Sequence, residues 1–169
     1  RARVLSIIGV VLFESEAAAE AVYEKVPELS RRALLAVLQS LAVDLDGQAK
    51  QRVQRLVRTT GLEQFIRRRC GAHRWRIRIQ AAQLHHLVDH PDFDRRRLLE
   101  DRHPMVAARA AEALTPAQAA AQLDALLPML SAKDTVVRLA AQQAVLTAGP
   151  AAVPRLLIRL RSTVDDPLS

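Results

Sequence analysis

The sequence predicts an all-α protein in which helix pairs stack in a row, an arrangement called a solenoid. Three stretches share one spacing of apolar and small residues, and they begin at Ile77, Val106 and Val137, which are 29 and 31 residues apart. Such a period is typical of repeats that each bury one face against the next. The composition agrees, because Ala and Leu dominate while aromatic residues make up only 3% of the chain. An extended surface of this kind suits binding a partner better than enclosing a small substrate.

The first 70 residues predict helices that lack the repeat spacing. The expected helices span residues 3–22, 31–45, 48–59 and 62–70. Ser30 is expected to cap the second helix, the pair Asp46-Gly47 to end it, and Gly61 to separate the last two. We therefore expect residues 1–70 to form a divergent helical cap that shields the open end of the array.

The apolar run from Val4 to Phe13 permits two interpretations. Its length is too short to cross a bilayer. It is either a buried helix or the exit end of a membrane helix that begins before residue 1. The second interpretation would tether the protein to the inner face of a membrane.

Residues 71–162 are expected to form the regular repeats, with residues 163–169 as a tail. The expected helices span residues 74–88, 93–99, 105–114, 116–130, 135–147 and 151–160. Pro104 suits the first turn of a helix, where its missing N–H costs nothing. Asp134 is placed to cap the helix that follows it, and to pair with Arg138 four residues later.

The net charge of +7 is concentrated in one region. Residues 50–78 carry ten Lys or Arg and one Asp or Glu, whereas residues 79–169 carry ten of each. The predicted basic patch comprises Arg52, Arg55, Arg58, Arg67, Arg68, Arg74 and Arg76. One interpretation is that its arginines form a solvated face and interact favourably with the dipole at a helix C-terminus. The other is that they bind an anionic partner. That partner would be an acidic protein, nucleic acid or an anionic lipid surface.

The repeat segments resemble HEAT repeats of the short bacterial type, which also occur in phycobilisome-lyase-like proteins. The resemblance rests on Leu98-Leu99, Asp101, Pro104 and Val106 followed by paired alanines, and on Asp134 with Val137-Arg138. The middle unit departs from the pattern because Ala107 stands where Arg is expected. The resemblance implies a right-handed α–α superhelix and protein–protein scaffolding rather than a reaction. It further implies a concave partner-binding face formed by Gln80, Gln83, His86, Arg109, Glu112 and Gln143.

Catalytic and metal chemistry find little support in the sequence. His86 and His90 lie four residues apart, but Pro91 indicates that the helix has ended there, which spoils a metal-binding geometry. Trp75 lies among arginines and invites comparison with HEAT-like DNA glycosylases, although no carboxylate lies close to it in sequence. Phosphate loops, nucleophile elbows and paired-cysteine zinc motifs are absent. We expect no cofactor, no metal and no small-molecule substrate.

The sequence therefore predicts a noncatalytic, cytoplasmic scaffold that binds another protein. A nucleic-acid-binding HEAT module that uses residues 50–78 is the alternative hypothesis. The single cysteine, Cys70, cannot form an intramolecular disulfide and agrees with a reducing compartment. Cys70 itself is expected to be a small core residue.

Overall fold

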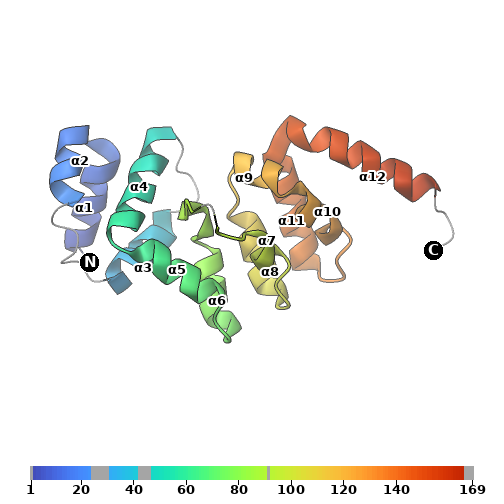
Figure 1. The fold of residues 1–169 in the computed structure, drawn as a ribbon, viewed down its shortest axis with the longest axis horizontal. Coiled ribbons are helices and arrows are strands. Elements are labelled where there is room, and N and C mark those ends of the chain that lie inside the picture. The colour runs from blue at the N-terminus through green and yellow to red at the C-terminus, as the bar shows by residue number, and fades with distance from the viewer. Residues whose placement is uncertain (1, 24–30, 42–46, 91, 166–169) are drawn as a thin grey trace. The chain divides into compact units, whose positions relative to one another are not determined.

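The computed structural model describes residues 2–23, 31–41, 47–90 and 92–165 (Figure 1). Every regular element within these ranges is a helix and none is a strand, which confirms the all-α prediction. The chain divides into two compact units, Arg1–Phe93 and Asp94–Ser169, called unit 1 and unit 2 below. The predicted boundary at residue 71 concerns the sequence repeats rather than compactness and stays a prediction.

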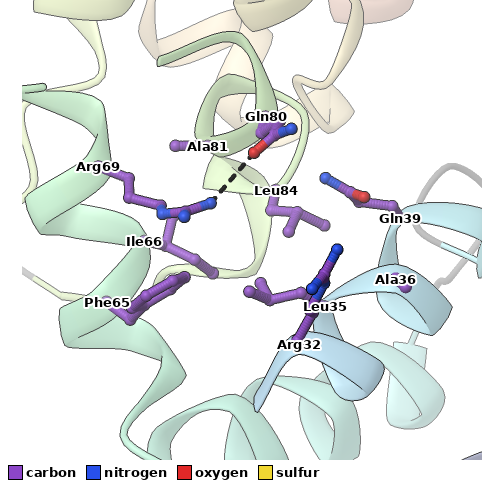
Figure 2. Close-up of a pocket in the computed structure, with 10 residues that line it drawn as sticks. All are labelled: Arg32, Leu35, Ala36, Gln39, Phe65, Ile66, Arg69, Gln80, Ala81 and Leu84. Carbon is purple, nitrogen blue, oxygen red and sulfur yellow. Dashed lines mark hydrogen bonds between the residues drawn. The ribbon is translucent and has the colours of Figure 1, made fainter. Parts of the chain in front are cut away.

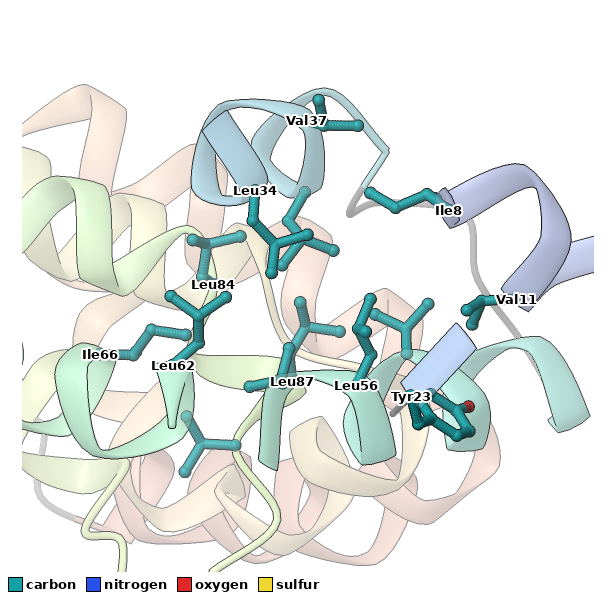
Figure 3. Packing of buried hydrophobic residues seen from close by; sticks show 14 of the residues in the cluster. Ile8, Val11, Tyr23, Leu34, Val37, Leu56, Leu62, Ile66, Leu84 and Leu87 are labelled. Atoms are coloured by element: carbon teal, nitrogen blue, oxygen red, sulfur yellow. The ribbon is translucent and has the colours of Figure 1, made fainter. Parts of the chain in front are cut away.

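Unit 1 consists of six α-helices and one short 3₁₀ helix within its described residues. These are α1 (Ala2–Phe13), α2 (Glu16–Tyr23), α3 (Arg31–Leu41), α4 (Gly47–Thr59), α5 (Leu62–Cys70), α6 (Trp75–Ala82) and η2 (His85–Leu87). Each helix from α1 to α5 contributes aliphatic or aromatic side chains to one core, which also takes in residues 81–88 (Figure 3). Val11 and Leu56 are fully buried there, and Cys70 packs half-buried against the same core.

Two helices of unit 1 are shorter than predicted. The expected helix 3–22 breaks at Ser15, whose hydroxyl accepts a hydrogen bond from the amide of Ala18 (3.3 Å) and starts α2. The expected helix 74–88 ends at Ala82. Residues 84–88 are all buried, so a continuous helix would turn some of them toward solvent, and a tighter 3₁₀ turn replaces it.

Other boundaries agree closely with the sequence. The helices predicted at residues 48–59 and 62–70 occur as α4 and α5, and Gly61 separates them with a φ of 67°, a conformation that favours glycine. Helix α3 begins where it was predicted and is described to Leu41. The proposed cap Ser30 and the break at Asp46 lie outside the described residues.

Unit 2 contains six α-helices and a 3₁₀ turn within the part that the structure describes. These are α7 (Arg96–Leu99), α8 (Pro104–Glu112), α9 (Pro116–Ala121), α10 (Leu123–Met129), α11 (Thr135–Ala148), η3 (Gly149–Ala152) and α12 (Val153–Asp165). Helix α11 packs mainly on α8, and buried alanines such as Ala110, Ala111, Ala140 and Ala141 let the two helices approach closely. The spacing seen in the sequence therefore serves helix packing.

Three helix boundaries in unit 2 differ from the prediction. The expected helix 93–99 is reduced to α7, and the expected helix 116–130 is divided at Gln122 into α9 and α10. The amide of Gln122 is bonded to Gln118 and Ala119, which closes α9 after less than two turns. Helix α12 continues to Asp165, so the predicted tail begins later than residue 163, and residues 166–169 lie outside the described part.

An arginine in each unit makes the same pair of hydrogen bonds to backbone carbonyls. Arg78 donates from Nη1 to the carbonyls of Ala72 (2.9 Å) and His73 (2.7 Å). Arg138 donates in the same way to the carbonyls of Ala132 (2.9 Å) and Lys133 (2.9 Å). In each case the guanidinium closes the turn that precedes its own helix, and we call this arrangement the arginine clamp. At the equivalent position of the middle repeat, Ala107 carries no donor.

The N-terminus of α11 combines one confirmed and one wrong prediction. Asp134 caps the helix, since its carboxylate accepts hydrogen bonds from the amides of Val136 (2.9 Å) and Val137 (3.4 Å). The expected ion pair between Asp134 and Arg138 is not formed between these two described residues. Arg138 turns to the carbonyls instead, and its second nitrogen donates to the Thr135 hydroxyl (3.1 Å).

Candidate functional site

The three α4 arginines of the predicted basic patch contact other segments of unit 1. Arg52 donates to the carbonyls of Val11 (3.4 Å) and Glu14 (2.7 Å), where it satisfies the C-terminal end of α1. Arg55 pairs with Glu20 at 2.6 Å, and Arg58 pairs with Asp89 at 3.2 Å. Each of these arginines thus contacts its own chain, while Arg55 and Arg58 stay at least half exposed, and their place in an anion-binding stripe stays a prediction.

The remaining arginines gather around the turn between α5 and α6. Arg67, Arg68 and Arg69 end α5, and Arg74 and Arg76 lie at the start of α6. Within the described residues, Arg67, Arg68 and Arg74 form no ion pair or hydrogen bond through their side chains. Because α5 and α6 are consecutive and pack on each other, these five arginines lie at the ends of the two helices that flank the turn. We call this cluster the basic turn.

A groove of about 630 Å³ lies beside the basic turn, within unit 1 (Figure 2). It is bounded by α3, α5 and the end of α6. Its lining consists of Arg32, Leu35, Ala36, Gln39, Phe65, Ile66, Arg69, Gln80, Ala81 and Leu84. Ile66, Ala81 and Leu84 are at most 2% exposed and form a rigid apolar floor. Among the described residues, the lining contains cations and amides but no carboxylate, so it favours an occupant that is both apolar and anionic.

Arg69 joins the basic turn to the groove. Its guanidinium lies over the Phe65 ring at 4.4 Å from the ring centre and donates to Gln80 Oε1 at 3.1 Å. Figure 2 shows these groups on one wall of the groove and Arg32 extending from α3 on the other. Arg69 is therefore held in place before any ligand arrives, which lowers the entropy lost on binding.

The residues predicted to form a concave partner-binding face differ in burial and contacts between unit 1 and unit 2. In unit 1, Gln80 lines the groove, Gln83 is half-buried and His86 is only 5% exposed. His86 thus lies in the core instead of on a partner-binding surface, because the helix ends at Ala82 and the 3₁₀ turn directs it inward. In unit 2, Arg109 and Glu112 pair with each other at 2.5 Å on α8.

Gln143 is exposed on α11, alongside large apolar residues that face solvent. Leu139 and Leu146 of this helix are 59% and 73% exposed. On α12, Arg155 pairs with Asp124 (3.2 Å), while Val153 and Leu157 remain about half exposed. Unit 2 therefore presents apolar side chains of the kind that interaction surfaces use.

Sequence reasoning missed the α3 wall of the groove. Arg32, Leu35 and Gln39 lie more than 25 residues before Phe65 in sequence, and helical periodicity assigns both helices to the core without relating them. The run of arginines that ends α5 was the available signal for the other wall. It identified the region but could not show which guanidinium faces an apolar floor.

Trp75 and the neighbouring histidines are the remaining residues with the chemistry of a binding or metal site. Trp75 is 37% exposed, and the Arg76 guanidinium lies 5.6 Å from its ring centre, so the ring is partly accessible to solvent. His85 is fully buried and stacks on Phe93 at 6.3 Å. Among the described residues, no group of three or more His, Cys, Asp or Glu side chains is arranged to hold a metal ion.

Comparison with models of known protein families, with curated protein sequences and with solved structures yields no match. The resemblance to HEAT repeats therefore stays a prediction. Across the described residues, no helix has both the length and the hydrophobicity that a bilayer crossing requires.

Proposed function

We propose that this chain is a noncatalytic protein-interaction module built from HEAT-like helical hairpins. The observation that carries the proposal is the α3/α5/α6 groove beside the basic turn, where an apolar floor meets guanidinium groups that no described carboxylate neutralises. The groove is open at the surface, and its described lining residues include no paired acid, base or nucleophile of a catalytic site. The exposed leucines of α11 add a second apolar surface in unit 2.

The repeat architecture is part of this proposal. The arginine clamp supports it, because Arg78 and Arg138 occupy the same place in two units and make the same hydrogen bonds. We propose that the hairpins stack as a right-handed superhelix, which exposes more surface than a compact globule does. Small-angle X-ray scattering tests this, since a compact chain of this length has a radius of gyration of about 15 Å. A measured value that small would contradict the superhelix.

The interaction itself is tested by site-specific cross-linking in cells. A photoreactive amino acid replaces Gln80, which lines the groove, and in a matched control it replaces the exposed Gln51 of α4. A discrete protein that is cross-linked from position 80 and not from position 51 supports the proposal. Absence of any protein adduct from position 80, or adducts shared equally by both positions, contradicts it.

Nucleic-acid binding is the second candidate, and one observation favours it. Trp75 is partly exposed between Arg74 and Arg76, so a base could stack on its ring while the arginines contact phosphates. A salt titration separates the two candidates. Binding through phosphates weakens steeply between low and moderate salt, whereas a protein interface with apolar contacts weakens less.

Tethering to a membrane remains a prediction. Helix α1 buries Ile8 and Val11 in the core of unit 1 and leaves Leu5 and Phe13 exposed, at 53% and 85%. The protein sequence that precedes residue 1 in the gene tests the idea directly. A run of about 20 apolar residues there would establish an anchor.

A further inference from the structure

We propose that the α3/α5/α6 groove binds an acidic amphipathic helix of the partner protein. The helix would place its apolar side chains on the floor and its carboxylates against Arg32 and Arg69. This inference rests on the proposed function and specifies the chemistry of the partner.

The charge of the lining selects an anion. Of the lining residues that the structure describes, Arg32 and Arg69 are the ionisable ones, and both are cationic. Arg32 is exposed, and its side chain makes no ion pair or hydrogen bond with any described residue. The guanidinium group matches the planar carboxylate with two parallel hydrogen bonds, which gives direction as well as attraction. A carboxylate that enters from solvent can therefore be held from either wall.

The floor requires an apolar partner as well. Leu35 and Phe65 are half-buried at the sides, and Ile66 and Leu84 are closed off beneath them. Nucleic-acid phosphates would satisfy the arginines but leave this apolar surface wet. An amphipathic helix satisfies both, because residues at i, i+3, i+4 and i+7 share one face and acidic residues can flank them.

The volume of the groove and the fixed position of Arg69 suit the side chains of a bound protein segment. A volume of about 630 Å³ accommodates several aliphatic side chains, and the opening lets the backbone that carries them remain outside. Arg69 already has the support of Phe65 and Gln80, so little of its freedom is lost when the ligand binds. The groove thus presents a fixed cation above a fixed apolar floor.

The test uses the full chain and a synthetic helical peptide as the probe. The peptide carries Leu at i, i+3, i+4 and i+7 with flanking Glu residues, and a control peptide carries Gln in place of Glu. Fluorescence anisotropy gives the Kd, and amide chemical shifts in ¹⁵N spectra locate the contact. We expect the largest shifts in α3, α5 and α6, and weaker binding of the Gln peptide by about tenfold.

Two double variants with the same change of charge provide the decisive comparison. Arg32→Gln with Arg69→Gln removes both groove cations, whereas Arg67→Gln with Arg68→Gln removes two cations of the basic turn that do not line the groove. We expect the first pair of substitutions to raise the Kd of the Glu peptide by about tenfold or more, and the second pair by less than about threefold. Circular dichroism spectra of both variants verify that they fold.

Several results would overturn the inference. Equal losses in both double variants would show general attraction to positive charge. Equal affinity for the Glu and Gln peptides, or shifts outside the groove, would remove the role of the carboxylates or of the site. Displacement of the peptide by a short DNA oligonucleotide at lower concentration would make nucleic acid the better occupant. A protein cross-linked from position 80 whose affinity survives the loss of Arg32 and Arg69 would refute this inference and leave the proposed function standing.

Discussion

Replacing Arg78 by Met should destabilise unit 1 more than the equivalent change destabilises unit 2. The Arg78 side chain is 6% exposed and donates two short hydrogen bonds to backbone carbonyls. Hydrogen bonds from charged groups contribute about 1.5–3 kcal/mol each, and part of that is recovered when water reaches the exposed turn. We expect Arg78→Met to lower the free energy of unfolding of unit 1 by about 2–4 kcal/mol.

Arg138→Met is the matched control in unit 2. Arg138 makes the same carbonyl contacts but is only half-buried, so water replaces it more easily. We expect this variant to lose about 1–2 kcal/mol. Met preserves the apolar stem of both side chains as far as the position of Nε, so the change is mainly the loss of the guanidinium group.

The assay exploits the position of the single tryptophan. Trp75 begins α6 and lies in unit 1, so its fluorescence in a urea titration reports unit 1, while far-ultraviolet circular dichroism reports the helices of both units. Arg78→Met should lower the midpoint of the fluorescence transition, and Arg138→Met should leave that midpoint nearly unchanged. A loss below about 0.5 kcal/mol for Arg78→Met, or equal fluorescence shifts for both variants, would refute the reasoning.

Three further changes test other parts of the structure by urea denaturation. Ile66→Ala should cost unit 1 about 2–5 kcal/mol, because Ile66 is 1% exposed in the core, and a cost below 1 kcal/mol would mean that the core is loose. Gly149→Ala should destabilise unit 2 by about 1–3 kcal/mol, since its φ is 62°, whereas Gly71→Ala at φ −90° should cost much less. Arg52→Ala should lower the free energy of unfolding by about 1–2 kcal/mol through the lost contacts with α1, whereas Arg68→Ala should change it by less than about 0.5 kcal/mol. A larger loss for Arg68→Ala than for Arg52→Ala would show that the basic turn has the structural role.

Local signals in the sequence predicted those helices whose ends are marked by a boundary residue. Gly61 separates α4 from α5, Pro104 begins α8 and Asp134 caps α11, and each signal acts within a few residues of itself. The breaks that the sequence did not reveal depend on more distant contacts. Residues 84–88 leave the helical path because the core of unit 1 buries all of them, which periodicity along one helix does not encode.

The candidate site shows the same division. The charge count identified the basic region of the sequence, but it could not show which contacts Arg52, Arg55 and Arg58 make within the chain. Arg58 lies 31 residues from its partner Asp89, and Arg52 lies 41 residues from Val11. These pairings therefore depend on the fold. The groove needs α3 beside α5 and α6, which is likewise a property of the packing.

The arginine clamp has an evolutionary consequence. Its acceptors are main-chain carbonyls, which every residue type possesses, so the side chains at positions 72, 73, 132 and 133 are free to drift while the guanidinium keeps the connection closed. The two turns already differ, with His73 in one and Lys133 in the other. Divergent descendants of this chain should vary at these loop positions before they vary at Arg78 or Arg138.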